Sequence, residues 1–347
     1  MSRAKREIPA GGASIQDVAR EAGVATSTVS RALTVPGRVS EKTRARVLEA
    51  ANRLGYTANA AARNLRVGRS GVVLIVLPGP LNAGASQVIA EMLLVIDTEL
   101  VALGYSLLIA NIDRQLNAER YVLNLAFSGV TDGAIIFSSI PPEVDGRSLA
   151  SSGVPLVSAL FDLSDRGIPS VVTNDRQAAR DTITHLIGLG HRNFLYVGGP
   201  RGNYHEVERH SGVREALAER ADCTLAYSPG EFDFASGSAA AEAFLDSSPR
   251  PTAVFCCSDD MAIAFIRRLA DSGIRVPDEV SVVGFDGSSV GTYLVPSLSS
   301  VRQPTNLIAR KIVQAIIDLM KRKTEVRLRT VVPSSLVIRE SVAAPIR

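Results

Sequence analysis

IQDVAREAGVATSTVSRAL, residues 15–33, predicts two short helices joined by a tight turn. Ser14, three residues before Asp17, is typical of a capping box, which starts a helix. Apolar residues recur at helical spacing on one face of this first helix: Ile15, Val18 and Ala22. Gly23 supplies the turn, because glycine readily adopts the left-handed conformation that ends helices. The second helix follows directly, with small hydroxyl side chains and one cation on its polar face.

A third helix is predicted from SEKTRARVLEAANRLGY, residues 40–56, with Ser40 as its N-cap and Gly55 as its C-cap. We expect four of its side chains to face inward: Val47, Leu48, Ala51 and Leu54. A helix, a glycine turn and a second short helix form the helix-turn-helix arrangement, whose second helix enters the DNA major groove. The hydroxyls and the guanidinium of residues 24–33 would then contact base edges and phosphates.

Charge is divided unevenly along the chain. Residues 1–70 hold 13 Lys or Arg and 5 Asp or Glu, a net charge of +8, whereas the rest of the chain holds 25 basic and 30 acidic residues, a net charge of −5. A basic segment on a mildly acidic body favours contact of that segment alone with a polyanion. A solvated charged tail is the alternative, but the basicity runs through well-patterned helices.

The 347 residues, 46% of them hydrophobic, indicate a globular protein of two or three domains. The apolar run at residues 72–77 is too short to span a bilayer, and the N-terminus lacks the apolar core of a secretory signal. We therefore expect a cytoplasmic protein that does not bind a membrane. Cys256 and Cys257 lie in an apolar run without metal or redox spacing, so we expect buried reduced thiols.

Beyond residue 71 the pattern changes to apolar strands that alternate with helices. Strands are predicted at residues 72–77, 105–111, 133–138, 154–160, 193–199, 224–228, 253–258 and 280–286. Helices are predicted near residues 86–103, 119–127, 176–189, 206–220, 236–245 and 261–272. Repeated strand–helix units imply two α/β lobes with parallel sheets covered on both faces. Ligands of such lobes bind at the carboxyl ends of the strands, in the crevice between the lobes.

The N-terminal stretch, together with VSEKTRARVLEAANRLGYTANAAARNL, closely resembles the DNA-binding head of the lactose/galactose repressor family. The resemblance continues to about residue 340 through HLIGLGHRNFLYVGGP, SDDMAIAF, VPDEVSVVGFD and PSLSSVRQP. It implies an all-α helix-turn-helix head and hinge helix, joined to a two-lobed body with the fold of periplasmic sugar-binding proteins. Chain crossovers near residues 160, 290 and 300 would act as hinges between the lobes.

The same resemblance implies the division of the chain into domains. A basic arm would cover residues 1–13, the DNA-binding domain 14–57, the hinge helix and linker 58–70, and the effector-binding and dimerisation domain 71–347. The chain ends at SVAAPIR without the leucine heptad that a four-chain assembly would use, so we expect a two-fold homodimer.

DNA contacts are carried over from the family residue by residue. Thr26 and Ser27 occupy its variable base-reading pair, and three further residues match positions that contact phosphates and bases: Thr28, Ser30 and Arg31. In the hinge, Asn59 and Leu65 are predicted to contact DNA, Leu65 as the leucine that enters the minor groove and kinks the duplex. The family usually has proline where this chain has Ala58, which makes the start of the hinge less rigid.

Two residues lead the predicted effector site. Arg209 aligns with the arginine that clamps the effector in relatives, and Asp286 aligns with a carboxylate that accepts hydroxyl or ring N–H donors; the alternative for each is an ion pair at the surface or between domains. Further candidates are Asp162, Ser258, Phe232, Asn203 and His205. Phe232 could stack on a sugar face or fill the core. Arg209 with Asp286 suits a polyol, a sugar or a sugar phosphate.

Two departures from the family bear on the ligand. Residues 82–85 read NAGA where many relatives carry an Asn-Pro-aromatic-aromatic run, so we expect a smaller or more open pocket on that side. Ser258 stands where the family usually has asparagine. We therefore expect a ligand that differs from those of well-known relatives.

These patterns favour a ligand-responsive transcriptional repressor. Two heads would bind a pseudo-palindromic operator, and a small molecule in the cleft would act as inducer or corepressor. A solute-binding protein is the alternative, which would share the body but carry an export signal in place of the head. An enzyme is disfavoured, since P-loop, GxSxG and HExxH motifs are absent, and neither a cofactor nor a metal is expected.

Overall fold

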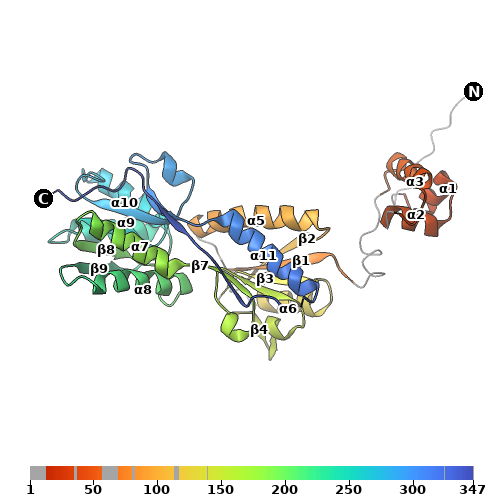
Figure 1. The fold of residues 1–347 in the computed structure, drawn as a ribbon, viewed down its shortest axis with the longest axis horizontal. Coiled ribbons are helices and arrows are strands. Elements are labelled where there is room, and N and C mark those ends of the chain that lie inside the picture. Colours follow the sequence, from red (N-terminus) through yellow and green to blue (C-terminus); the bar gives the residue numbers. More distant parts are fainter. Residues whose placement is uncertain are drawn as a thin grey trace, which may run out of the picture. The chain divides into compact units, whose positions relative to one another are not determined.

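A computed structural model describes residues 13–34, 37–56, 69–79, 83–112, 117–138, 140–323 and 325–346. The chain divides into two compact units, Met1–Ser70 and Gly71–Arg347 (Figure 1). Three residues of the predicted hinge, Ala58, Asn59 and Leu65, lie outside the described residues. No helix in the described ranges is long and apolar enough to cross a membrane.

Helices α1 (Ile15–Ala22), α2 (Thr26–Thr34) and α3 (Glu41–Arg53) build the first unit. Ser14 caps α1 as predicted: its hydroxyl accepts a hydrogen bond from the Asp17 N–H, and the Asp17 carboxylate accepts one from the Ser14 N–H. Gly23 ends α1 with a φ of 60°, and the Val24 N–H reaches back to the Ala19 carbonyl. The predicted helix, glycine turn and second helix are therefore present.

A small apolar core lies between these three helices. Its buried members are Val18, Ala19, Ala22, Val29, Ala32, Val47, Ala50 and Ala51. The predicted inward position of Leu48 is wrong, since its side chain is 38% exposed. Ala50 faces the core instead, because residues 47, 50, 51 and 54 share one helical face. The C-cap of α3 is Leu54, and Gly55 follows it in the left-handed conformation, with a φ of 61°.

The second unit consists of two lobes, each a six-stranded sheet with helices on both faces (Figure 1). In the first lobe all neighbouring strands are parallel, in the order β13–β7–β6–β3–β1–β2. Its strands are β1 (Val72–Pro78), β2 (Ser106–Ile112), β3 (Gly133–Ile136), β6 (Leu156–Ala159), β7 (Ser170–Thr173) and β13 (Arg329–Val332). A short hairpin of β4 (Glu143–Val144) and β5 (Arg147–Ser148) follows β3.

Three helices cover the sheet of the first lobe: α5 (Ala83–Ala102), α6 (Ala118–Phe127) and α11 (Thr305–Met320). Strand β1 shows why its sequence is a continuous apolar run. Val73 and Ile75 pack in the cluster under α5 and α11, whereas Leu74 and Val76 pack under α6 on the opposite face. A parallel strand with both faces buried needs apolar side chains at every position.

The second lobe has the strand order β14–β12–β11–β10–β8–β9, parallel except for β14. Its strands are β8 (Asn193–Val197), β9 (Thr224–Ser228), β10 (Ala253–Cys256), β11 (Ser281–Asp286), β12 (Ser299–Arg302) and β14 (Ser335–Val337). Its helices pair as α7 (Asp175–Gly188) with α8 (Tyr204–Ala218) and α9 (Phe234–Leu245) with α10 (Asp259–Asp271). Cys256 and Cys257 are buried free thiols, as predicted.

The chain crosses between the lobes three times. The crossings lie near residue 174, between β7 and α7, near residue 303, between β12 and α11, and near residue 333, between β13 and β14. The prediction near residue 300 is close, but those near 160 and 290 are wrong. Strand β7 extends the first sheet past residue 160, and residue 290 lies in the loop between β11 and β12 of the second lobe.

Candidate functional site

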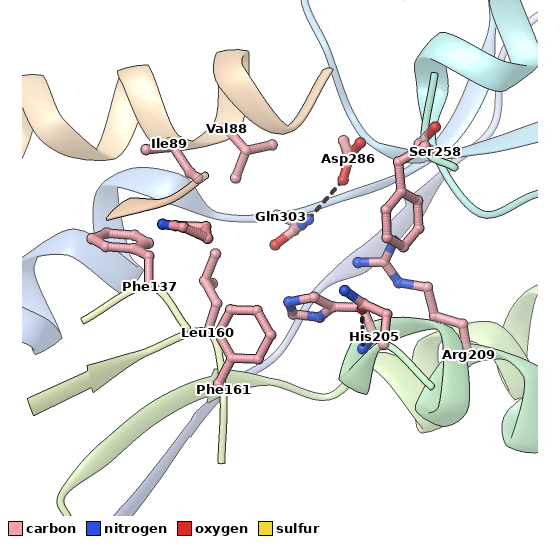
Figure 2. Close-up of a pocket in the computed structure, with 13 residues that line it drawn as sticks. Val88, Ile89, Phe137, Leu160, Phe161, His205, Arg209, Ser258, Asp286 and Gln303 are labelled. Atoms are coloured by element: carbon pink, nitrogen blue, oxygen red, sulfur yellow. Dashed lines mark hydrogen bonds between the residues drawn. The ribbon is translucent and has the colours of Figure 1, made fainter. Parts of the chain in front are cut away.

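A cavity of about 160 Å³ is lined by residues of both lobes (Figure 2). The side chains from the first lobe are all apolar: Pro78, Val88, Ile89, Phe137, Leu160 and Phe161. The second lobe and the crossing near residue 303 contribute Asn203, His205, Arg209, Phe232, Ser258, Asp286 and Gln303. Most of these residues follow the carboxyl ends of parallel strands, where α/β lobes bind ligands. The cavity therefore has an apolar wall facing a polar one, and we refer to it as the cleft.

Arg209 lies on α8 and is 4% exposed. Its Nε donates to Asp175 Oδ2 over 3.0 Å, and its Nη1 donates to the Cys257 carbonyl oxygen over 2.6 Å. The guanidinium carbon lies 3.5 Å from the centre of the Phe285 ring. Burial acts to raise the pKa of Asp175, but Arg209 and His205 outweigh it and hold that pKa well below its usual range. Arg209 is thus held in place by the protein's own groups.

The first turn of α8 brings two predicted residues to the cleft. Asn203 is the N-cap of α8, and its side-chain oxygen accepts a hydrogen bond from the His205 N–H over 2.9 Å. His205 Nδ1 lies 2.9 Å from Asp175 Oδ2. The His205 ring also lies 5.0 Å from the ring of Phe161 in the other lobe. The histidine therefore contacts both lobes at once.

Asp286 ends β11 with a φ of 122°, a conformation that residues other than glycine rarely adopt. Its Oδ1 accepts a hydrogen bond from Gln303 Nε2 over 2.8 Å. Burial raises the pKa of Asp286 to about 8; Arg209 opposes this effect and Asp259 adds to it. Burial thus favours the protonated carboxyl group, which can donate as well as accept a hydrogen bond.

Gln303 was not predicted from the sequence, although it lies within the PSLSSVRQP landmark. Its side chain is 6% exposed, and its Oε1 is buried without a hydrogen-bond partner among the described residues. Figure 2 shows this oxygen turned into the cavity, on the opposite side of the amide from the bond to Asp286. A buried acceptor without a donor costs about 1–3 kcal/mol, which a donor on a ligand would remove.

Ser258 and Phe232 line the cleft, whereas Asp162 is absent from its lining. Ser258 also caps α10, where its hydroxyl accepts a hydrogen bond from the Met261 N–H. The Asp162 carboxylate instead accepts hydrogen bonds from the Ser164 hydroxyl, over 2.6 Å, and from Arg329 Nε, over 2.5 Å. These two partners turn Asp162 away, so its neighbours Leu160 and Phe161 reach the cleft in its place. No cluster of His, Cys, Asp or Glu in the described ranges could hold a metal ion.

The polar face of α2 is presented to solvent in the first unit. Thr26, Ser27 and Arg31 are exposed, and Thr28 and Ser30 are partly buried. Val29 and Ala32, which are buried in the core, hold the opposite face of the helix. The five predicted DNA contacts in the head therefore share the one helix that a helix-turn-helix domain inserts into the major groove.

Two family models match the chain. The model "Bacterial regulatory proteins, lacI family" matches residues 14–59, and the model "Periplasmic binding protein-like domain" matches residues 183–342. Together they cover the helical head and most of the second lobe.

Relatives and a solved structure extend the match over nearly the whole chain. The HTH-type transcriptional regulator CelR of Thermobifida fusca is 34% identical over 94% of this chain and 97% of its own length. Catabolite control protein A of Priestia megaterium is 32% identical over 89% of this chain and 93% of its own. The crystal structure of the Lac repressor dimer, bound to operator and the anti-inducer ONPF, matches with a TM-score of 0.83 and 25% identity, covering 96% of this chain and 100% of that one.

Proposed function

Because this chain belongs to the LacI family of bacterial regulatory proteins, we propose that it is a transcriptional repressor whose affinity for operator DNA changes when a small molecule binds the cleft. The Lac repressor structure is that of a dimer on its operator with an anti-inducer, which supports the same three partners here: DNA, an effector and a second copy of the chain. The relatives are regulators rather than solute-binding proteins or enzymes. A repressor acts where the DNA is, so we place the protein in the cytoplasm.

In this proposal the head reads the operator through α2. Thr26 and Ser27 contact base edges, and Arg31 with the hydroxyls of Thr28 and Ser30 contacts bases and phosphates. The exposure of Thr26, Ser27 and Arg31 supports these roles, and short donors with one guanidinium suit both kinds of contact. Residues 14–57 form the DNA-binding domain, and residues 58–70 form the hinge, in which Asn59 contacts DNA and Leu65 enters the minor groove. Residues 71–347 bind the effector and form the dimer.

The proposal that a ligand binds in the cleft rests on Gln303 Oε1, which has no hydrogen-bond partner among the described residues. A ligand hydroxyl or N–H that reaches this oxygen would supply the donor that the described protein groups do not. Asp286, whose burial favours the protonated carboxyl group, offers a second hydrogen bond beside it. Phe161 and Phe232 provide apolar faces for a ring.

The volume of the cleft and the pairing of its arginine limit the class of ligand that it can bind. A cavity of about 160 Å³ is close to the engineered cavity of roughly 150 Å³ that holds one benzene molecule. The cation of the cleft, Arg209, is already paired with Asp175, so a phosphate would have to compete with a buried carboxylate. We therefore propose an uncharged single-ring ligand, such as a monosaccharide or cyclic polyol, rather than a sugar phosphate.

The three crossings near residues 174, 303 and 333 let the lobes change their relative orientation around the ligand. Gln303 lies on one of these crossings, so a ligand bound to it favours one orientation over the other. A hundredfold change in operator affinity requires about 2.7 kcal/mol of coupling, which lies within the usual range for allosteric proteins.

The experiment is a thermal-shift screen of the full chain against uncharged monosaccharides and cyclic polyols, with the phosphorylated form of each as the matched control. We expect an uncharged compound to raise the melting temperature and its phosphate to have no effect. The stabilising compound is then titrated against operator complexes selected from random duplex DNA. Stabilisation by the phosphates alone would overturn the ligand class, and a chain that prefers no duplex over random DNA would overturn the repressor.

A further inference from the structure

A second cavity, of about 480 Å³, lies in the second lobe beside the part of α8 that lines the cleft. His205 and Arg209 of this helix face the cleft, whereas Glu206 and His210 line the second cavity. Its remaining walls come from the loops that follow β8 and β9, with Tyr227 at the end of β9. The second cavity is thus built from the same helix as the cleft, by an adjacent face, because successive residues lie about 100° apart around the helix axis.

A buried carboxylate lies at the base of this second cavity. Glu206 is 4% exposed, and its Oε2 accepts hydrogen bonds from the Gly199 N–H over 2.7 Å and the Tyr196 hydroxyl over 2.8 Å. Its Oε1 has a much weaker contact, 3.4 Å from the Tyr227 hydroxyl. Buried carboxylates are stabilised when donors satisfy both oxygens, and Oε1 can accept a stronger hydrogen bond than the one from Tyr227.

Gly198 packs closely against this oxygen. A Cβ at Gly198 would lie 2.8 Å from Glu206 Oε1 and 2.7 Å from the Tyr227 hydroxyl oxygen, closer than side-chain carbons approach either atom. A side chain at residue 198 would therefore require the Glu206 and Tyr227 side chains to shift.

The wall and mouth of the cavity suit an organic zwitterion. The rings of His210 and Tyr227 lie 5.2 Å apart and both line the cavity with Glu206. The face of the Tyr227 ring can attract an ammonium group. Arg201 is exposed at the mouth. Burial raises the pKa of Tyr227, and Arg201 is close enough to oppose that effect. A carboxylate and a guanidinium in the lining of one cavity complement a small molecule that carries both an ammonium group and a carboxylate.

We propose that this cavity binds a free α-amino acid as a second effector, with its ammonium group on Glu206 and its carboxylate on Arg201. The amino acid side chain lies along Tyr227 and Val207. Binding here does not depend on the function proposed for the cleft.

A chain of buried polar contacts connects the two cavities. The Tyr196 hydroxyl, bonded to Glu206, lies 3.2 Å from Cys257 Sγ, and the carbonyl oxygen of Cys257 accepts the hydrogen bond from Arg209 in the cleft. An ammonium group bound to Glu206 weakens the hydrogen bond between Glu206 and the Tyr196 hydroxyl. The change passes through Cys257 to the hydrogen bond that holds Arg209. This influence on the cleft, unlike the binding itself, rests on the proposed function.

The test is calorimetric titration of the full chain with each of the twenty standard L-amino acids. We expect at least one to bind, while its methyl ester and its N-acetyl derivative, which each lack one charge, do not. Arg201→Ala should weaken binding at least tenfold, and Val207→Trp should abolish it by filling the cavity. Arg220→Ala, which removes another exposed arginine of the same lobe, and the cleft variant Gln303→Leu should bind normally.

Three results would overturn this site: no amino acid binds, binding is unchanged in both Arg201→Ala and Val207→Trp, or binding is lost in Gln303→Leu but kept in Val207→Trp. The last result would place the amino acid in the cleft. Operator binding is measured separately on the same variants, so failure of the second site and failure of the proposed repressor give different results.

Discussion

Arg209 and Asp175 form an ion pair of 3.0 Å in which the side chains are 4% and 1% exposed. The pair joins α8 to the first residue of α7, directly after the crossing near residue 174. Buried pairs of this kind hold together only when further hydrogen bonds satisfy both partners, as the Cys257 carbonyl and the Thr173 hydroxyl do here. Arg209 is therefore part of the packing of the second lobe as well as of the cleft wall.

Arg209→Ala should lower the free energy of unfolding by about 3–5 kcal/mol, because it leaves a buried carboxylate without its cation. Urea denaturation followed by circular dichroism measures the loss. The matched control is Arg180→Ala, which breaks the solvent-exposed pair with Glu219 and should cost at most about 1 kcal/mol. Equal effects of the two substitutions would show that the buried pair contributes no more than a surface one.

Gly212→Ala should destabilise the second lobe by about 1–3 kcal/mol through overpacking. A Cβ at residue 212 would lie 2.0 Å from the carbonyl oxygen of Arg176, so α7 and α8 would have to move apart. Gly188→Ala, in the last turn of α7, is the matched control because nothing lies within 4 Å of its Cβ position; it should stabilise the helix by about 0.5–1 kcal/mol. Denaturation midpoints that move in the same direction would contradict this account.

Gln303→Leu should weaken binding of the cleft ligand at least about tenfold while leaving the free energy of unfolding within about 1 kcal/mol of the wild type. The substitution removes the hydrogen bond to Asp286 but also removes a buried acceptor that has no donor, and these effects offset each other. Calorimetric titration with the compound found in the screen, paired with urea denaturation, measures both quantities. Wild-type affinity in this variant would place the ligand elsewhere.

Stability should depend on pH through Asp286. Its pKa in the folded chain, about 8, lies above the ordinary value of 3.8, so the folded chain keeps a proton that the unfolded chain releases. The resulting contribution to the free energy of unfolding is complete below about pH 4 and is lost as the pH rises to about 8. The pKa of Asp286 also depends on Asp259, Asp175 and Arg209. The measurement therefore compares the wild type with one variant at each pH.

That variant is Asp286→Asn, whose amide resembles the protonated carboxyl group and does not titrate. Its free energy of unfolding should rise relative to the wild type as the pH increases from 5 to 8, as measured by urea denaturation at each pH. A difference that stays constant over this range would mean that Asp286 is ionised throughout.

Arg31→Ala should weaken binding to the selected operator by about 1–3 kcal/mol. It should also reduce the slope of the logarithm of the binding constant against the logarithm of salt concentration by about one. The control is Arg20→Ala on α1, an exposed arginine paired with Asp17, which should change operator affinity much less. Fluorescence anisotropy at several salt concentrations measures both effects. If the two variants bind alike, α2 is not the helix that reads the DNA.

The head was predictable because its determinants are local. The cap at Ser14, the turn at Gly23 and the apolar spacing of each helix act within a few residues, so the sequence alone indicates them. Leu48 shows the limit of this reasoning, since apolarity does not tell which helical face meets the core. The alternating apolar runs of the body likewise indicate two α/β lobes, because strands buried on both faces must be apolar throughout.

Only the tertiary structure determined which residues line the cleft. Gln303 and Phe161 meet there because separate crossings and strand ends converge, and no local pattern marks the unpaired oxygen of one or the ring of the other. Asp162 looks like a ligand residue in sequence, yet Arg329, 167 residues later, holds its carboxylate away. A site made of groups far apart in the chain depends on which partners the fold brings to each of them, and that is a property of packing rather than of sequence spacing.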